Sequence, residues 1–139
     1  MVFGILTGLE QVQVKNYYRT SEEGELKNMK EDIYNYLEKF EARTKQRFCD
    51  LHKLVYESTS EKIDEKLWAK MPSFYVNDNF IRLIPFKDHI NIEAKAVVFH
   101  KDELLGYKIT PKGMLQIFHN QQVHCELLKT IFKESFKQC

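Results

Sequence analysis

The chain has 139 residues, of which 43% are hydrophobic and 29% are charged, with 21 lysines and arginines against 20 aspartates and glutamates. This length and composition are typical of one globular domain with its own core, and they argue against an intrinsically disordered chain. The nearly balanced charge provides no general attraction to nucleic acid or to anionic membranes, so we expect neither as a partner.

The cysteines indicate a reducing compartment. Cys49, Cys125 and Cys139 are odd in number, widely spaced and form no CxxC motif. Such a pattern argues against a disulfide framework or a structural zinc site. The apolar N-terminus is too short for a signal peptide, and no run reaches the ~18 apolar residues that a membrane span needs. We therefore expect a cytoplasmic protein.

Residues 1–28 show no amphipathic period and end in a polar stretch. One interpretation is a disordered N-terminal extension. The other is an extension added by a mis-called start, with Met29 as the true first residue. The second rests on the sequence Glu-Glu-Gly-Glu at 22–25, which a purine-rich ribosome-binding site would encode if it were translated in frame. Residues 29–139 are expected to form a single domain.

The first regular elements after Met29 are predicted to be helices. Apolar residues at helical spacing, from Ile33 to Phe40, predict a helix over 31–41, and the same spacing predicts a second helix over 44–58. The alternation of Leu67, Ala69 and Met71 then predicts a strand. Pro72 indicates a bend or the end of that strand, because proline cannot donate a ladder hydrogen bond.

The run 70–93 predicts three short strands joined by two tight turns. The apolar segments 74–76 and 80–84 flank Asn77-Asp78-Asn79, and asparagine and aspartate tolerate the left-handed backbone of a tight hairpin. Lys87-Asp88 forms the second predicted turn, and 89–93 alternates as a strand does.

The C-terminal third adds a helix, a strand and a final helix. Residues 95–104 are predicted to be helical with Val98, Phe99 and Leu104 as apolar positions, ended by Gly106. A strand at 114–118 and an amphipathic helix at 123–136 follow. Because hairpins dominate, we predict a two-layer α+β sandwich, with a mainly antiparallel sheet and helices on one face.

Basic and aromatic side chains gather at the predicted strand ends and turns, where binding groups often lie on a rigid sheet. They could line a pocket at the sheet edge for a small anionic ligand; the candidates are Met71, Phe74, Lys87, His89, Lys108 and Lys112. The alternative interpretation is that the aromatic residues belong to the core and the lysines are solvated.

The sequence contains no GxSxG, P-loop, GxGxxG or HExxH pattern, and no two histidines pair on one helix face. We therefore expect a non-enzymatic protein. Glu38 and Glu41 share a predicted helix face, and such pairs can hold a hard cation weakly through oxygen ligands. Glu31 and Asp32 lie in the first turn of that helix, where they favour the helix dipole.

Three boxes in order resemble the YdhG-like family of small bacterial domains. The first box is Met71-Pro72-Ser73-Phe74, and the second is Phe86-Lys87-Asp88-His89. The third is Gly106-Tyr107-Lys108, followed by Thr110-Pro111-Lys112-Gly113. The resemblance covers about residues 31–137.

The resemblance implies a frataxin-like fold. Some members of the family are described as intracellular iron chaperones that deliver iron to iron–sulfur assembly or haem insertion, so it implies iron as cargo and such proteins as partners. In frataxin-like proteins, carboxylates on the first helix and the adjacent strand edge hold iron. At matching positions this chain has Glu31, Asp32, Glu38 and Glu41. A monomer or a weak homodimer is expected.

Overall fold

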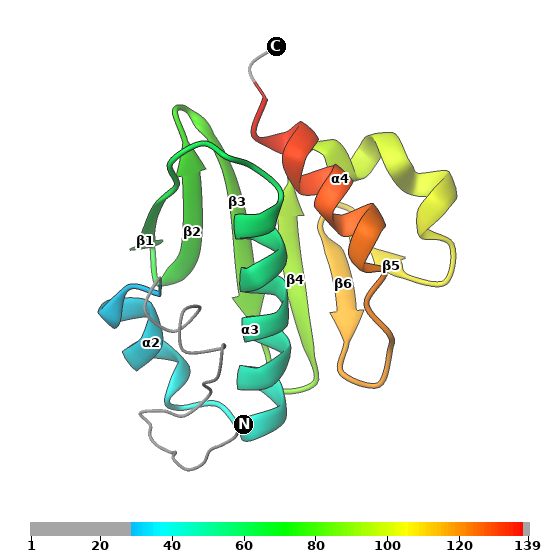
Figure 1. Cartoon of the computed structure of the whole chain (residues 1–139). Coiled ribbons are helices and arrows are strands. Elements are labelled where there is room, and N and C mark those ends of the chain that lie inside the picture. The colour runs from blue at the N-terminus through cyan, green and yellow to red at the C-terminus, as the bar shows by residue number, and fades with distance from the viewer. Residues whose placement is uncertain (1–28, 138–139) are drawn as a thin grey trace. The chain divides into compact units, whose positions relative to one another are not determined.

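The computed structural model describes residues 29–137 of the chain (Figure 1). The chain divides into two compact units, Met1–Asn35 and Tyr36–Cys139, and the short helix α2 (Glu31–Leu37) crosses the boundary between them. Both interpretations of the extension 1–28 concern residues outside the described ones. The second unit contains the whole sheet.

The second unit is built on a six-stranded antiparallel sheet. Its elements are α3 (Ala42–Glu57), β1 (Asp64–Trp68), β2 (Met71–Val76), β3 (Asn79–Pro85), β4 (His89–Ala94), the 3-10 helix η1 (Lys95–Leu104), β5 (Lys108–Ile109), β6 (Leu115–Phe118) and α4 (Cys125–Ser135). The strand order is β1-β2-β3-β4-β6-β5, and each neighbouring pair is antiparallel. The α+β class with an antiparallel sheet is therefore confirmed. Strand β5 was missed because two residues carry no periodic signal.

The core lies between the sheet and the helices α3 and α4, which cover the same face of the sheet (Figure 1). Alternate strand residues point to this side and are fully buried, as period-two geometry requires. Among them are Phe74, Ile81, Leu83, Ile90, Ile92 and Leu115, which lie against Phe48 and Leu51 of α3 and Ile131 and Phe132 of α4.

The three strands predicted within 70–93 are confirmed as β2, β3 and β4. In the first hairpin Val76 pairs with Asn79, and Asn77 takes the left-handed conformation with φ 55°. In the second, Pro85 pairs with Ile90, and the Phe86 amide donates to the His89 carbonyl at 2.8 Å.

The strand predicted through Leu67, Ala69 and Met71 is wrong, because a reversal interrupts it. Ala69 (φ 51°) and Lys70 (φ 66°) both have left-handed backbones, and Trp68 pairs with Met71 across them. Two consecutive positive φ angles between paired strands are typical of a type I′ hairpin turn. Neither residue is glycine, asparagine or aspartate, so the turn had no sequence signal.

Pro72 does not end a strand as predicted. It lies inside β2 and pairs with Leu67 of the outer strand β1, whereas pairing with β3 begins only at Ser73. Pro72 therefore lies next to the edge strand β1 and just before the stretch of β2 that pairs with β3. Its missing N–H is tolerated at this position, because no β3 residue pairs with it.

Two predicted helices differ in detail. The first helix ends at Leu37 rather than residue 41, because the Phe40 amide donates back to the Leu37 carbonyl at 3.0 Å in a turn. Glu41 instead occupies the N-cap position of α3. The second helix begins at Ala42 and ends at Glu57, close to the predicted 44–58.

The predicted apolar face of residues 95–104 is largely wrong. The segment is a 3-10 helix, interrupted at His100 by a non-helical backbone (φ −121°, ψ 22°). Its buried residues are Ala96, Val97 and Leu104, whereas Val98 and Phe99 are exposed. A 3-10 helix has about 3.0 residues per turn, and with the break at His100 it buries a different set of side chains from the apolar positions named in the sequence.

His100 connects η1 to α4. Its Nδ1 lies 2.6 Å from Glu103 Oε1, and its Nε2 lies 2.7 Å from Glu134 Oε1. These hydrogen bonds, first to Glu134 and then to Glu103, raise the pKa of His100. A histidine whose pKa is higher in the folded than in the unfolded state stabilises the fold. This stabilisation is fully present at pH values below the pKa of the unfolded state, and it is lost as the pH rises through the pKa of the folded state.

We therefore expect His100→Gln to lower the free energy of unfolding by about 1 kcal/mol at pH 6 and by less at pH 9, because only the charged ring holds both carboxylates strongly. Urea unfolding of both proteins at the two pH values measures this difference. An equal loss at both pH values would contradict a charged His100.

Candidate functional site

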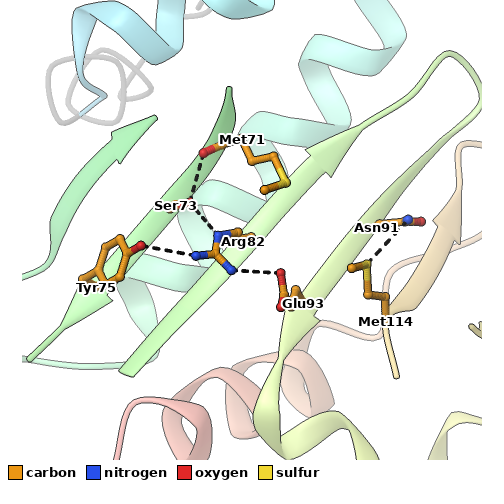
Figure 2. A network of polar contacts seen from close by, with 7 residues as sticks. All are labelled: Met71, Ser73, Tyr75, Arg82, Asn91, Glu93 and Met114. Carbon is orange, nitrogen blue, oxygen red and sulfur yellow. Dashed lines mark hydrogen bonds and ion pairs between the residues drawn. The ribbon is translucent and has the colours of Figure 1, made fainter. Parts of the chain in front are cut away.

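The sheet face opposite α3 and α4 carries a polar network centred on Arg82 (Figure 2). Its Nε donates to Ser73 Oγ at 3.1 Å, Nη1 donates to Glu93 Oε1 at 3.1 Å, and Nη2 donates to the Tyr75 hydroxyl at 3.3 Å. Strand register produces this arrangement, because Ser73 pairs with Arg82 and Arg82 pairs with Glu93 on three adjacent strands.

Arg82 is also enclosed by aromatic rings. Its guanidinium carbon lies 4.3 Å from the centroid of the Trp68 ring and 3.9 Å from that of Phe80. The side chain is only 8% exposed, although it belongs to the face away from the helices. A cation that is buried, paired and stacked in this way serves the structure. We therefore do not assign Arg82 to a ligand.

A second polar cluster lies on the helix side of the sheet. His52 Nε2 is 3.0 Å from Glu65 Oε1, and both side chains are 1% exposed. The Tyr56 hydroxyl donates to the same carboxylate oxygen. Burial, and then the bond to Glu65, raise the pKa of Tyr56. An ionised carboxylate only accepts hydrogen bonds, so His52 Nε2 and the Tyr56 hydroxyl are the donors.

The six side chains predicted to line a ligand pocket do not converge. By strand register and alternation, Met71, His89 and Lys108 lie on the face that carries Arg82. Phe74 lies on the opposite face and is fully buried, since residues three apart on one strand point to opposite sides. For Phe74, the alternative interpretation as a core residue is the correct one.

His89 and Lys87 lie at one end of the sheet. The His89 ring is stacked on the Phe86 ring with 4.7 Å between their centroids, and its centroid lies 4.9 Å from that of the Phe118 ring. The Nδ1 atom of His89 is 2.7 Å from Asp88 Oδ1. Lys87 is exposed, and its carbonyl accepts a hydrogen bond from Thr44 of α3 at 3.3 Å. These contacts give the segment Phe86-Lys87-Asp88-His89 a structural role in closing the β3–β4 turn.

Lys112 lines a small pocket of about 230 Å³ on the side of the sheet that carries Arg82. Phe80, Glu93 and Val98 are among the other lining residues. The volume is below the ~300–1,000 Å³ typical of small-molecule sites. Glu93 is already paired with Arg82.

The four carboxylates implied for iron are exposed. Glu31 and Asp32 lie in the first turn of α2, Glu38 follows that helix, and Glu41 precedes α3. Glu38 Oε1 lies 3.6 Å from Lys45 Nζ, so this carboxylate already forms an ion pair. Among residues 29–137, no group of three His, Cys, Asp or Glu side chains is placed to hold a metal ion. Iron binding by these residues stays a prediction.

A larger cleft of about 550 Å³ lies where three segments meet. It is lined by the connection after α3, the β2–β3 turn and the end of α4, through Glu57, Ser58, Thr59, Ser60, Glu61, Val76, Asn77, Lys133, Phe136 and Lys137. Val76 and Phe136 are each 4% exposed and provide apolar packing beneath it. Its volume lies within the range of small-molecule sites.

Hydrogen bonds fix two sides of this cleft to each other. Asn79 Nδ2 donates to the Phe136 carbonyl at 3.2 Å and to the Lys137 carbonyl at 3.1 Å. Lys95 Nζ donates to Asn79 Oδ1 at 2.7 Å and to the Lys137 carbonyl at 3.0 Å. The β2–β3 turn and the end of α4 are therefore held together before any ligand arrives.

The charges of the cleft are separated by segment. Glu57 is the last residue of α3 and Glu61 lies in the connection after it, whereas Lys133 lies near the end of α4 and Lys137 just follows that helix. Glu57 lies 3.9 Å from Lys129, a long ion pair. Within the described part of the chain, the ammonium groups of Lys133 and Lys137 and the Glu61 carboxylate form no ion pair. The cleft thus has an acidic and a basic side, each with unpaired charge.

Sequence reasoning missed this cleft. Lys133 and Lys137 are four residues apart at the end of an amphipathic helix, and Asn77 was assigned to a tight turn. Those signals were available, but nothing in the local pattern brings residues 57–61 beside either segment. The cleft depends on strand order, which only the fold reveals.

The chain was compared with protein-family models, curated proteins and solved structures, and no match was found in any of the three. Among the described residues, none of the helices has both the length and the apolar character required to cross a membrane.

Proposed function

We propose that this protein is a non-enzymatic binding domain that holds a small phosphorylated polyol in the cleft between the ends of α3 and α4. The observation that carries the proposal is the separation of unpaired charge across a preformed cleft of about 550 Å³. Lys133 and Lys137 would hold the phosphate, while Glu61 and Asn77 would bind hydroxyl groups at the other end of the ligand.

The chemistry of the lining residues supports this class of ligand. A phosphate monoester carries a charge of about −1.5 to −2 near neutral pH, which matches two ammonium groups better than a single carboxylate does. Carboxylate and amide oxygens accept hydrogen bonds from hydroxyl groups.

Isothermal titration calorimetry with glucose 6-phosphate tests the proposal. We expect saturable binding that Lys133→Ala/Lys137→Ala weakens by at least about tenfold, because each charge-assisted hydrogen bond contributes roughly 1.5–3 kcal/mol. Glucose and inorganic phosphate, each offering one half of the ligand, should bind more weakly than the whole.

Lys53→Ala is the control, since Lys53 is an exposed lysine of α3 that does not line the cleft. Equal losses in Lys53→Ala and the double variant would indicate a general charge effect and contradict the site. Absence of saturable binding would contradict this ligand class.

Membership of the YdhG-like family and a frataxin-like fold remain proposals. The three ordered boxes support them, and the antiparallel α+β architecture is compatible with them. Transfer of iron to iron–sulfur or haem assembly proteins would follow from that membership. It involves the carboxylates near α2, which are different residues from those of the cleft.

A further inference from the structure

Among the described residues, the two most exposed large apolar side chains, Leu105 and Phe99, lie next to and on η1, and Val98 is close by. Phe99 is 77% exposed, Leu105 is 82% exposed and Val98 is 46% exposed. Exposed single apolar residues are common, but three large ones within eight positions of one short element are not. This group, with the neighbouring Lys101 and Asp102, is called the η1 patch below.

The structure holds these side chains outward. The Ala96 amide donates to Ser135 Oγ of α4 at 3.0 Å, and the His100 ring is bonded to Glu134 of the same helix at 2.7 Å. These contacts lie before and after Val98 and Phe99 and anchor the segment to α4. Rotating η1 to bury Phe99 would break both. The exposure is therefore a property of the fold.

The charges of η1 favour a partner with the same mixed charge. The helix contains two lysines and two acidic residues, and Glu103 is already bonded to His100. Lys101 and Asp102 are adjacent, exposed and without an ion pair in the described part of the chain. In a two-fold arrangement, Lys101 of each copy can face Asp102 of the other. A strongly acidic or strongly basic partner would be attracted by one of these two charges and repelled by the other.

We propose that the η1 patch is a two-fold interface between two copies of this chain. Phe99 and Leu105 would be its apolar centre, and the Lys101–Asp102 pairs would set its orientation. These few residues form only part of the ~800 Å² per partner that a standard interface buries, so the dimer is weak and depends on concentration. The interface is separate from the phosphate cleft and does not rest on it.

Sedimentation velocity of the full chain over a wide concentration range tests this interface. The wild-type protein is expected to shift from monomer to dimer as the concentration rises. Phe99→Asp and Leu105→Asp should each weaken dimerisation by tenfold or more, the size of effect seen when a central interface residue is lost. Circular dichroism checks that both variants are folded.

Charge reversal provides a second readout. Lys101→Asp places an acidic residue opposite the partner's Asp102 and should weaken the dimer, whereas Lys101→Asp/Asp102→Lys restores the pairing of opposite charges and should recover it. Phe86→Asp is the control, since Phe86 is 43% exposed at the β3–β4 turn and lies outside the patch. A wild-type monomer at every concentration, or a dimer that Phe99→Asp leaves unchanged, would overturn the proposal.

Discussion

Arg82→Met is expected to lower the free energy of unfolding by about 2–4 kcal/mol. The substitution keeps much of the apolar stem that packs between Trp68 and Phe80, but removes the cation that bonds Ser73 and Glu93. Breaking a buried ion pair by removing one partner typically costs 3–5 kcal/mol. We place the effect lower because Glu93 is 35% exposed and water can solvate it in the variant.

Equilibrium unfolding in urea measures this effect. A double variant, Arg82→Met/Glu93→Met, should cost less than the sum of the two single variants, because it leaves neither charge unpaired. Lys66→Met is the matched control on the same face: its ion pair with Asp64 is between side chains 50% and 65% exposed, so we expect a change within about 0.5 kcal/mol. Equal effects of Arg82→Met and Lys66→Met would contradict a structural role for the network.

Glu65→Ala is expected to destabilise the protein by about 3–5 kcal/mol, the largest effect predicted for a single substitution. The side chain is 1% exposed and accepts hydrogen bonds from His52 and Tyr56. Its removal would leave the His52 ring nitrogen buried without a partner, and His52 Nδ1 already has none in the described residues. Unpaired buried donors carry the full cost of lost hydration.

The apolar triple variant His52→Phe/Tyr56→Phe/Glu65→Leu replaces all three members of the cluster and leaves no donor without its acceptor. Replacing a buried polar cluster by hydrophobic residues of similar size is often neutral, so the triple variant should be more stable than Glu65→Ala. The neighbouring Asp64→Ala serves as the control, since Asp64 is exposed on the same strand. Urea unfolding of all three variants measures these differences. Equal losses of stability in Asp64→Ala and Glu65→Ala would contradict the importance of the buried cluster.

Much of the sheet could be predicted because its hairpins have local signals. Asn77 tolerates a left-handed backbone, and the alternation in 89–93 matches strand β4. The turn at Ala69 and Lys70 could not be predicted, because neither residue type favours positive φ and the register of β1 and β2 imposes it. Tertiary pairing overrides local preference at such positions.

The candidate site was less predictable than the fold. The predicted pocket combined Met71 with Phe74, which strand alternation places on opposite faces. It also combined residues from β2, β4 and β5, whose separation depends on the strand order. Val98 and Phe99 were named as apolar positions of a helix over 95–104, but in the 3-10 helix η1 both are exposed, and Ala96 and Val97 are buried instead.

The position of Glu65 also bears on aggregation. β1 and β5 are the outer strands of the sheet, and outer strands present unpaired backbone groups to other molecules. β5 has only two residues, and β1 carries a buried carboxylate on the side that faces the helices. A very short outer strand and an inward-pointing charge both discourage a foreign strand from joining a sheet. Both edges of the sheet therefore carry a feature that limits fibre-like growth.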